Sequence, residues 1–132
     1  MQPPAPIWQP SPERIAQSHL TAFMRQVSDR WQVPLVSYPD LYRFSVGDPE
    51  KFWLSAWDYC GIVSEGSLDV VVEDLDRMPG ARWFPNVRLN FAENLLRRRD
   101  DGGALVLWSE DRSRRRMTFR ELGDAVSRAM SA

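Results

Sequence analysis

The sequence is poor in the residues that most often carry chemistry. Its 132 residues include one cysteine, Cys60, and one histidine, His19. A single cysteine excludes an intrachain disulfide, so the framework of a small secreted domain is excluded and a reducing compartment is expected. One cysteine and one histidine also fall short of the ligand set of a zinc site.

Long apolar runs and targeting signals are lacking as well. No window approaches the roughly 18 apolar residues of a membrane-spanning helix. The segment 1–12 is rich in proline and glutamine and has no basic region followed by an apolar core, so it does not resemble a signal peptide. The net charge of -1 gives no attraction toward nucleic acid or an anionic membrane. We therefore expect a cytoplasmic protein that binds neither.

The residue groupings of an active site are missing too. The adjacent pair Gly102-Gly103 precedes an expected strand, whereas a phosphate loop lies between a strand and the helix after it. His19 has no nucleophile or orienting acid near it, because Cys60 falls on another expected helix among aromatics. The spacing and glycine of a calcium loop are absent from the acidic residues Asp69, Glu73, Asp74 and Asp76. We predict no catalytic, cofactor-binding or metal-binding residue in this chain.

Two arginine runs are the strongest local charges. Segments 97–99 and 114–116 each hold three arginines, next to acidic residues. The interpretation that we favour is a helix C-terminus for the first run and a solvated or internally paired turn for the second. The alternative is a site for phosphate or an RNA backbone.

What the chain does have is apolar residues, at 43%, with helical spacing in its first half. After an extended arm over 1–10, Ser11-Pro12-Glu13 is typical of a helix start, and the helix is expected to run to Trp31. A second helix is expected from Asp48-Pro49-Glu50 to Cys60, ended by Gly61. Between them, residues 39–42 predict a short helical turn. The residues expected on the inner faces are Ala16, Leu20, Phe23, Met24, Val27, Trp31, Phe52, Trp53, Ala56, Trp57 and Cys60.

The second half mixes expected strands and helices. A β-branched run predicts a strand over 68–72, and Met78-Pro79-Gly80 predicts a turn. The cap Asn90 predicts a helix over 91–98, with Phe91, Leu95 and Ala92 facing inward. A hairpin is expected from 104–108, a turn at 111–113 and a returning strand over 115–117, and the capping box at 118–121 then begins a last helix. Such a hairpin needs a larger sheet to cover it, so an incomplete α/β fold is predicted.

Five aromatic residues raise one further alternative. They are Trp53, Trp57, Tyr59, Trp83 and Phe84. Aromatics at helical spacing are usually core, so we expect packing rather than a ligand platform. The irregular segment 83–85 is expected to clamp the arm and helices to a neighbouring domain.

In order and spacing, the sequence resembles the start of acetoacetate-CoA ligases, which are adenylate-forming acyl-CoA synthetases. The resemblance lies in 8–11, the helix around Phe23, residues 52–59, the block 78–96 and the segment 117–122. The later pieces are also similar to acetyl-CoA and propionyl-CoA synthetases.

The resemblance implies a fold and a function. It implies an arm over 1–10, a mainly helical N-terminal cap over 11–99, and over 100–132 the first hairpin and helix of the large α/β adenylation domain. It implies part of a ligase that activates acetoacetate with ATP and transfers it to coenzyme A, releasing AMP and pyrophosphate. ATP, magnesium and coenzyme A are implied for the full-length family, and Lys51 matches none of the family's catalytic settings. The partner is then the remainder of the adenylation domain, and this chain alone is expected to be inactive.

Two alternatives remain open at this point. The parent enzyme acts on acetate or propionate, or the chain is a non-catalytic interaction module that reuses the cap. In the second case the apolar face of the helix 119–129 would bind a partner.

Overall fold

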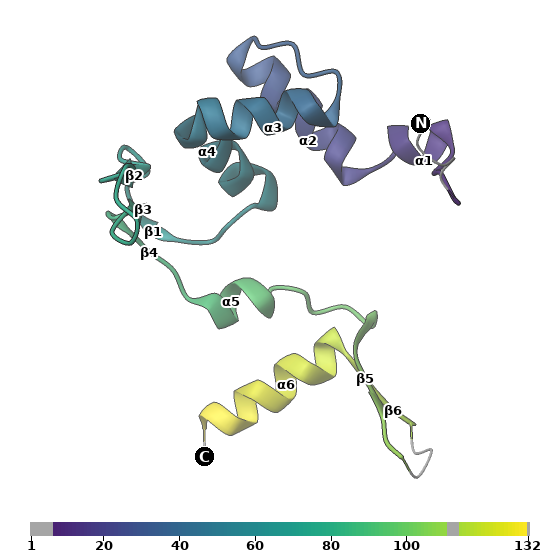
Figure 1. Ribbon diagram of the computed structural model, residues 1–132. Coiled ribbons are helices and arrows are strands. Elements are labelled where there is room, and N and C mark those ends of the chain that lie inside the picture. Colours follow the sequence, from purple (N-terminus) through teal and green to yellow (C-terminus); the bar gives the residue numbers. More distant parts are fainter. Residues whose placement is uncertain (1–6, 111–113, 132) are drawn as a thin grey trace. The chain divides into compact units, whose positions relative to one another are not determined.

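The computed structural model describes residues 7–110 and 114–131 (Figure 1). They divide into two compact units. The first unit runs up to Ile62 and includes Gly66–Val87, and the second joins Val63–Glu65 to the chain from Arg88 onward. In the described part of the chain, no helix is long and apolar enough to cross a membrane.

The predicted first helix is two helices, α1 (Pro12–Ala16) and α2 (His19–Trp31). Ser11 caps α1 as expected, since its side chain accepts from the Arg14 N–H. Ser18 then caps α2 by accepting from the Thr21 N–H at 3.1 Å. The single helix expected over 12–31 is therefore wrong, because a serine in extended conformation interrupts it with a second N-cap. Ala16, which was expected on the inner face of this helix, precedes the break and is exposed.

The expected turn at 39–42 is a full helix, α3 (Tyr38–Gly47). Its N-terminus has a reciprocal capping box, in which the Ser37 side chain accepts from the Asp40 N–H and the Asp40 carboxylate accepts from the Ser37 N–H. The second of these bonds is 2.8 Å long. Two satisfied backbone donors explain why the helix begins at this point.

The helix α4 (Pro49–Cys60) begins and ends where the sequence predicts. Gly61 follows it in the left-handed region, with φ 59°. The cap at its start is different from the expected one, because the Asp48 side chain makes no capping hydrogen bond. Instead the Asp48 carboxylate pairs with Lys51 at 3.3 Å.

The core of the first unit lies among α2, α3 and α4. Phe23 and Val27 of α2 pack with Leu41 and Phe44 of α3, and all four are buried. The hydrophobic residues packed around them are Met24, Trp31, Val33, Leu35, Phe52, Ala56 and Tyr59. Three further residues expected on the inner faces are exposed, namely Leu20, Trp53 and Cys60. The fully buried residue of α4 is a polar one, Ser55.

Two short strand pairs follow α4. The outer pair joins β1 (Glu65–Gly66) to β4 (Val87–Arg88), and inside it β2 (Val72–Glu73) pairs antiparallel with β3 (Arg82–Trp83). The strand expected over 68–72 is wrong except at its last residue. The described residues of this segment make single backbone hydrogen bonds instead of a continuous β-ladder. One example is the bond from the Phe84 N–H to the Val71 carbonyl at 2.7 Å. The turn at 78–80 is confirmed.

The second unit contains α5 (Phe91–Leu95), the hairpin β5 (Gly103–Trp108) with β6 (Arg114–Thr118), and α6 (Phe119–Met130). The hairpin is antiparallel, with Leu105 opposite Met117 and Leu107 opposite Arg115. The hairpin and the last helix are confirmed, while the turn expected at 111–113 lies outside the described residues.

Helix α5 is shorter than the expected 91–98, and the residues predicted to face inward are exposed, Phe91 at 70%. A side-chain amide holds this helix in place. Asn94 Oδ1 accepts from the Val63 N–H at 2.8 Å, and Asn94 Nδ2 donates to the Val63 carbonyl at 2.9 Å. The Asn94 amide thus bonds both backbone groups of Val63, as a neighbouring β-strand would.

Candidate functional site

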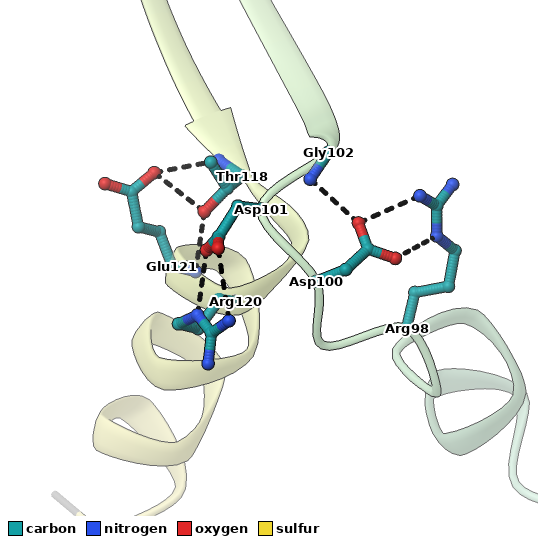
Figure 2. Close-up of polar contacts among 7 residues, drawn as sticks. All are labelled: Arg98, Asp100, Asp101, Gly102, Thr118, Arg120 and Glu121. Atoms are coloured by element: carbon teal, nitrogen blue, oxygen red, sulfur yellow. Dashed lines mark hydrogen bonds and ion pairs between the residues drawn. The ribbon is translucent and has the colours of Figure 1, made fainter.

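The most highly connected polar group in the second unit lies where the hairpin meets α6 (Figure 2). It begins with Arg98, whose Nε and Nη2 atoms donate to the two carboxylate oxygens of Asp100 at 2.8 and 2.9 Å. The same carboxylate also accepts the Gly102 N–H at 2.8 Å. Asp100 therefore fixes the loop that leads into β5.

A second bidentate pair lies beside the first one. Arg120 donates from Nε and Nη2 to the carboxylate of Asp101, at 2.9 and 3.3 Å. The Arg120 and Phe119 N–H groups donate to the carbonyls of Asp100 and Gly102 at 3.1 Å each. The first turn of α6 is thereby joined to the loop before β5 through both side chains and backbone.

The start of α6 is capped within the same group. The Thr118 hydroxyl accepts from the Glu121 N–H at 3.1 Å, and the Glu121 carboxylate accepts from the Thr118 N–H at 2.8 Å. The predicted capping box is confirmed. This cap and the two arginine–aspartate pairs lie at one end of the hairpin, as Figure 2 shows.

Each ionised form in this junction is favoured by its partner. The pKa of Asp100 is lowered, first by the hydrogen bond from Arg98 and then by that from the Gly102 backbone. The pKa of Asp101 is lowered by the hydrogen bond and the charge of Arg120. The pKa values of Arg98 and Arg120 are raised by the same bonds. Hydrogen bonds to the charged forms thus lower the pKa values of the two carboxyls and raise those of the two guanidinium groups.

The arginine run 97–99 serves this junction. The Arg98 guanidinium lies over the Phe119 ring at 4.0 Å, and Arg99 reaches the buried Gly123, where a Cβ would meet its Nη1 atom at 1.5 Å. The helix C-terminus expected for this run is wrong, because α5 ends at Leu95 and Arg98 pairs instead with Asp100. In the other run, the Arg114 guanidinium covers the Trp108 ring at 4.0 Å.

The histidine and the cysteine both belong to the first unit. His19 Nδ1 lies 3.1 Å from the Tyr59 hydroxyl, which donates to the His19 carbonyl at 3.0 Å. Cys60 is exposed at the end of α4.

The five aromatic residues make ring contacts within the first unit. The rings of Trp53 and Trp83 meet edge to face at 5.8 Å, and those of Trp57 and Phe84 lie 4.4 Å apart. Phe84 has φ 47°, a left-handed conformation that is rare for a bulky residue. These contacts make the segment 83–85 a support for α4. The prediction that it clamps a neighbouring domain stays a prediction.

A groove of about 690 Å³ lies on the first unit along α1, α2 and the residues before α3. Its walls are mostly apolar, with Arg14 and Arg25 among the lining residues. The Thr21 hydroxyl bonds the Ile15 carbonyl at 2.6 Å, and Ser18 bonds Thr21. None of the described lining residues is a histidine, an aspartate or a glutamate.

The described residues do not fit the groups that an ATP-dependent ligase handles. The Gly102 N–H, which a phosphate would need, is already donated to Asp100. Among the residues that the structure describes, no three histidine, cysteine or acidic side chains gather as metal ligands.

The sequence interpretation missed the two arginine–aspartate pairs. The sequence patterns assign no partner to Asp100 or Asp101, and the pair of Asp101 with Arg120 joins residues 19 positions apart. The only signal was an acidic pair between an arginine run and a capped helix. That pattern does not specify which partners meet.

Comparison with known proteins finds similarity to the N-terminal part of acyl-CoA synthetases. A family described as the acetyl-coenzyme A synthetase N-terminus matches residues 38–95. An acetoacetyl-coenzyme A synthetase of Rhizobium meliloti (strain 1021) is 37% identical over 132 residues, which is 100% of this chain and 20% of that protein. The malonamoyl-CoA synthetase of Penicillium aethiopicum is 34% identical, over 95% of this chain and 18% of its own length.

A solved structure is similar in the same region. The acetoacetyl-CoA synthetase from Streptomyces lividans matches 98% of this chain with a TM-score of 0.80 and 32% identity, and the match covers 21% of that chain. The chain therefore spans about a fifth of the length of the relatives that it matches.

Proposed function

We infer that the chain belongs to the family of acetoacetyl-CoA synthetases, as an N-terminal part, and we propose that it serves an enzyme that activates acetoacetate with ATP and transfers it to coenzyme A. The products of that reaction are acetoacetyl-CoA, AMP and pyrophosphate. The observation that carries the proposal is the match with the Rhizobium meliloti enzyme over the whole chain.

The role of this chain in such an enzyme is structural. The first unit has a closed core among α2, α3 and α4, which supports a helical cap over 11–99. In the second unit the junction of Arg98, Asp100, Asp101 and Arg120 holds the hairpin against α6, which supports the start of an adenylation domain over 100–132. The acid, ATP, magnesium and coenzyme A are then bound by the remainder of the enzyme.

Two observations favour a second candidate, a different acid. The matching family is described as the N-terminus of acetyl-coenzyme A synthetase, and one relative is named malonamoyl-CoA synthetase. Because the residues that would select the acid are expected outside this chain, acetate, propionate and malonamate are competing substrates. A non-catalytic module that uses the apolar face of α6 is the third possibility.

The experiment that decides among them uses the product of the complete coding sequence in which codons 1–132 lie. The purified protein is assayed for AMP formation that depends on coenzyme A, with each of the four acids in turn. The proposal predicts the highest kcat/KM for acetoacetate. A higher kcat/KM for another acid would identify that acid as the substrate instead of acetoacetate. A coding sequence that encodes no adenylation domain would contradict the proposal that the chain belongs to an enzyme.

A second test separates the role of this chain from the chemistry. In the Rhizobium meliloti enzyme, the segment that matches this chain is replaced by residues 1–132. The resulting full-length chimera should form acetoacetyl-CoA, while the 132-residue chain alone should release no pyrophosphate with acetoacetate. Activity of the chain alone would contradict its structural role.

A further inference from the structure

The groove along α1, α2 and the residues before α3 is lined by apolar side chains that remain open to water. Met24 and Leu35 line it and also pack against the core of the first unit. Ile15, Leu20 and Val36 line it with exposed fractions of 51%, 45% and 88%. Apolar side chains that gather on one concave surface and stay exposed are typical of a binding site.

The hydroxyl groups in the groove already have partners within the chain. The Thr21 hydroxyl donates to the Ile15 carbonyl at 2.6 Å, and the Ser18 hydroxyl donates to the Thr21 hydroxyl at 3.0 Å. The Ser37 hydroxyl donates to the Asp40 carboxylate at 2.6 Å. An apolar group can therefore lie against these walls without leaving a hydroxyl unpaired.

The charged side chains that line the groove are both cations, Arg14 and Arg25. Neither forms an ion pair with a carboxylate of the described residues. Asp29 lies one turn after Arg25 on α2, at a spacing that suits an ion pair, yet the two do not pair in the described chain. Arginine binds a carboxylate through two parallel hydrogen bonds, so two such cations beside apolar walls favour a ligand with an anionic group.

We propose that this groove binds a free anionic amphiphile, with its apolar chain along the exposed apolar walls and its anionic group paired with Arg14 or Arg25. The groove volume of about 690 Å³ lies within the range of about 300–1,000 Å³ that is usual for small-molecule sites. A bilayer surface fits less well, because anionic membranes attract clusters of about four to eight basic residues and the groove has two. The groove lies within the first unit, so the proposal does not depend on the reaction proposed above.

The test titrates decanoate, as monomers below its micelle concentration, into the 132-residue chain labelled with nitrogen-15. The amide shifts of residues 15–38 should give one dissociation constant, and those of β5, which is also apolar and exposed, should not follow it. Octanoate should bind at least about fourfold more weakly, because it lacks two methylene groups and each contributes up to about fourfold when it is buried. Decanol and decyltrimethylammonium keep the apolar chain but lack the negative charge, so they should bind about three- to tenfold more weakly than decanoate.

Matched substitutions separate the groove from the other exposed surfaces. Arg14→Gln combined with Arg25→Gln should weaken decanoate binding to the level of decanol. Arg88→Gln, at an exposed arginine of the second unit, should change it by less than about twofold. Leu20→Gln should weaken decanoate binding by about fivefold or more, while Leu105→Gln, at a β5 leucine that is 52% exposed, should not. Every substituted side chain is exposed, so each variant should unfold in urea at the midpoint of the unsubstituted chain.

Equal binding of decanoate and decyltrimethylammonium, or amide shifts at β5 in place of residues 15–38, overturns the proposal. The product of the complete coding sequence should bind decanoate with the same dissociation constant as the chain. Loss of binding there would show that the remainder of the protein covers the groove, and it also overturns the proposal. So does tighter binding to vesicles of phosphatidylcholine and phosphatidylglycerol than to monomeric decanoate, which would identify a bilayer as the ligand. Failure of the proposed function is distinct, because it appears in the assay with the four acids and leaves these titrations unchanged.

Discussion

The Trp31 indole N–H donates a 2.8 Å hydrogen bond to the hydroxyl of Ser55, which is fully buried between α2 and α4. The Ser55 hydroxyl donates in turn to the Lys51 carbonyl at 2.7 Å. The buried Ser55 hydroxyl therefore has both a donor and an acceptor as partners. It joins α2 to α4 through two residues that are 24 positions apart in the sequence.

Ser55→Ala should destabilise the first unit by about 1–3 kcal/mol, because it leaves the indole N–H without its acceptor. Ser45→Ala is the matched control, since the Ser45 hydroxyl also bonds a carbonyl of its own helix, that of Tyr42 at 2.8 Å, but has no partner on another of the described helices. Urea unfolding followed by tryptophan fluorescence gives both free energies. Equal effects of the two substitutions would mean that the bond to Trp31 contributes nothing.

The second prediction concerns the apolar core. Val27→Ala should cost about 2 kcal/mol, because Val27 is fully buried between α2 and α3 and the substitution leaves a cavity. Val36→Ala at an exposed site should stay within about 0.5 kcal/mol. Both values come from the same denaturant titrations, and a small effect at Val27 would contradict the core described above.

The third prediction concerns two glycines. Gly66→Ala should destabilise by more than about 1 kcal/mol, because Gly66 has φ 107° and a Cβ would meet the Asn86 carbonyl oxygen at 2.1 Å. Gly47→Ala, in helix α3 with open space around it, should instead be neutral or stabilise by up to about 1 kcal/mol. Thermal unfolding should order the three proteins accordingly, and a stable Gly66→Ala variant would exclude the close approach.

The fourth prediction is a pH dependence at the junction. Because the pKa values of Asp100 and Asp101 are lowered in the folded chain, their stabilising contribution is present above about pH 4 and is lost as the pH falls through the lowered pKa. The amide proton shift of Gly102 should follow this titration, since it bonds to Asp100.

Asp100→Asn is the control for that titration, because it removes the titrating carboxylate. The Gly102 shift should then no longer move over this pH range. A Gly102 shift in the unsubstituted chain with its midpoint above about pH 4 would contradict the predicted direction.

The sequence predicts much of this fold wherever a local signal determines the outcome. The starts of α1, α4 and α6 follow Ser11, Pro49 and Thr118, because caps and prolines act on the nearest backbone groups. The resemblance to acetoacetate-CoA ligases is confirmed, since relatives of that name match the whole chain.

The errors have two causes, a local cap that the sequence interpretation overlooked and partners that lie far away in the sequence. Ser18 was expected inside a helix, but its side chain caps α2 while Thr21 bonds back to Ile15. Residues 68–72 have strand composition but no continuous partner. The interpretation of Phe91 and Leu95 as inward-facing assumed a neighbour that the described chain does not provide.

The nested pairing of β1 with β4 and of β2 with β3 has a consequence for how the chain can vary. A segment whose two ends are held side by side can be lengthened at its tip without moving the residues that flank it. The tip includes Met78, which is fully exposed. Homologous chains can therefore differ in length at this tip while the strands at its base stay paired, and the same position is where a protease or an inserted peptide tag would act with least damage.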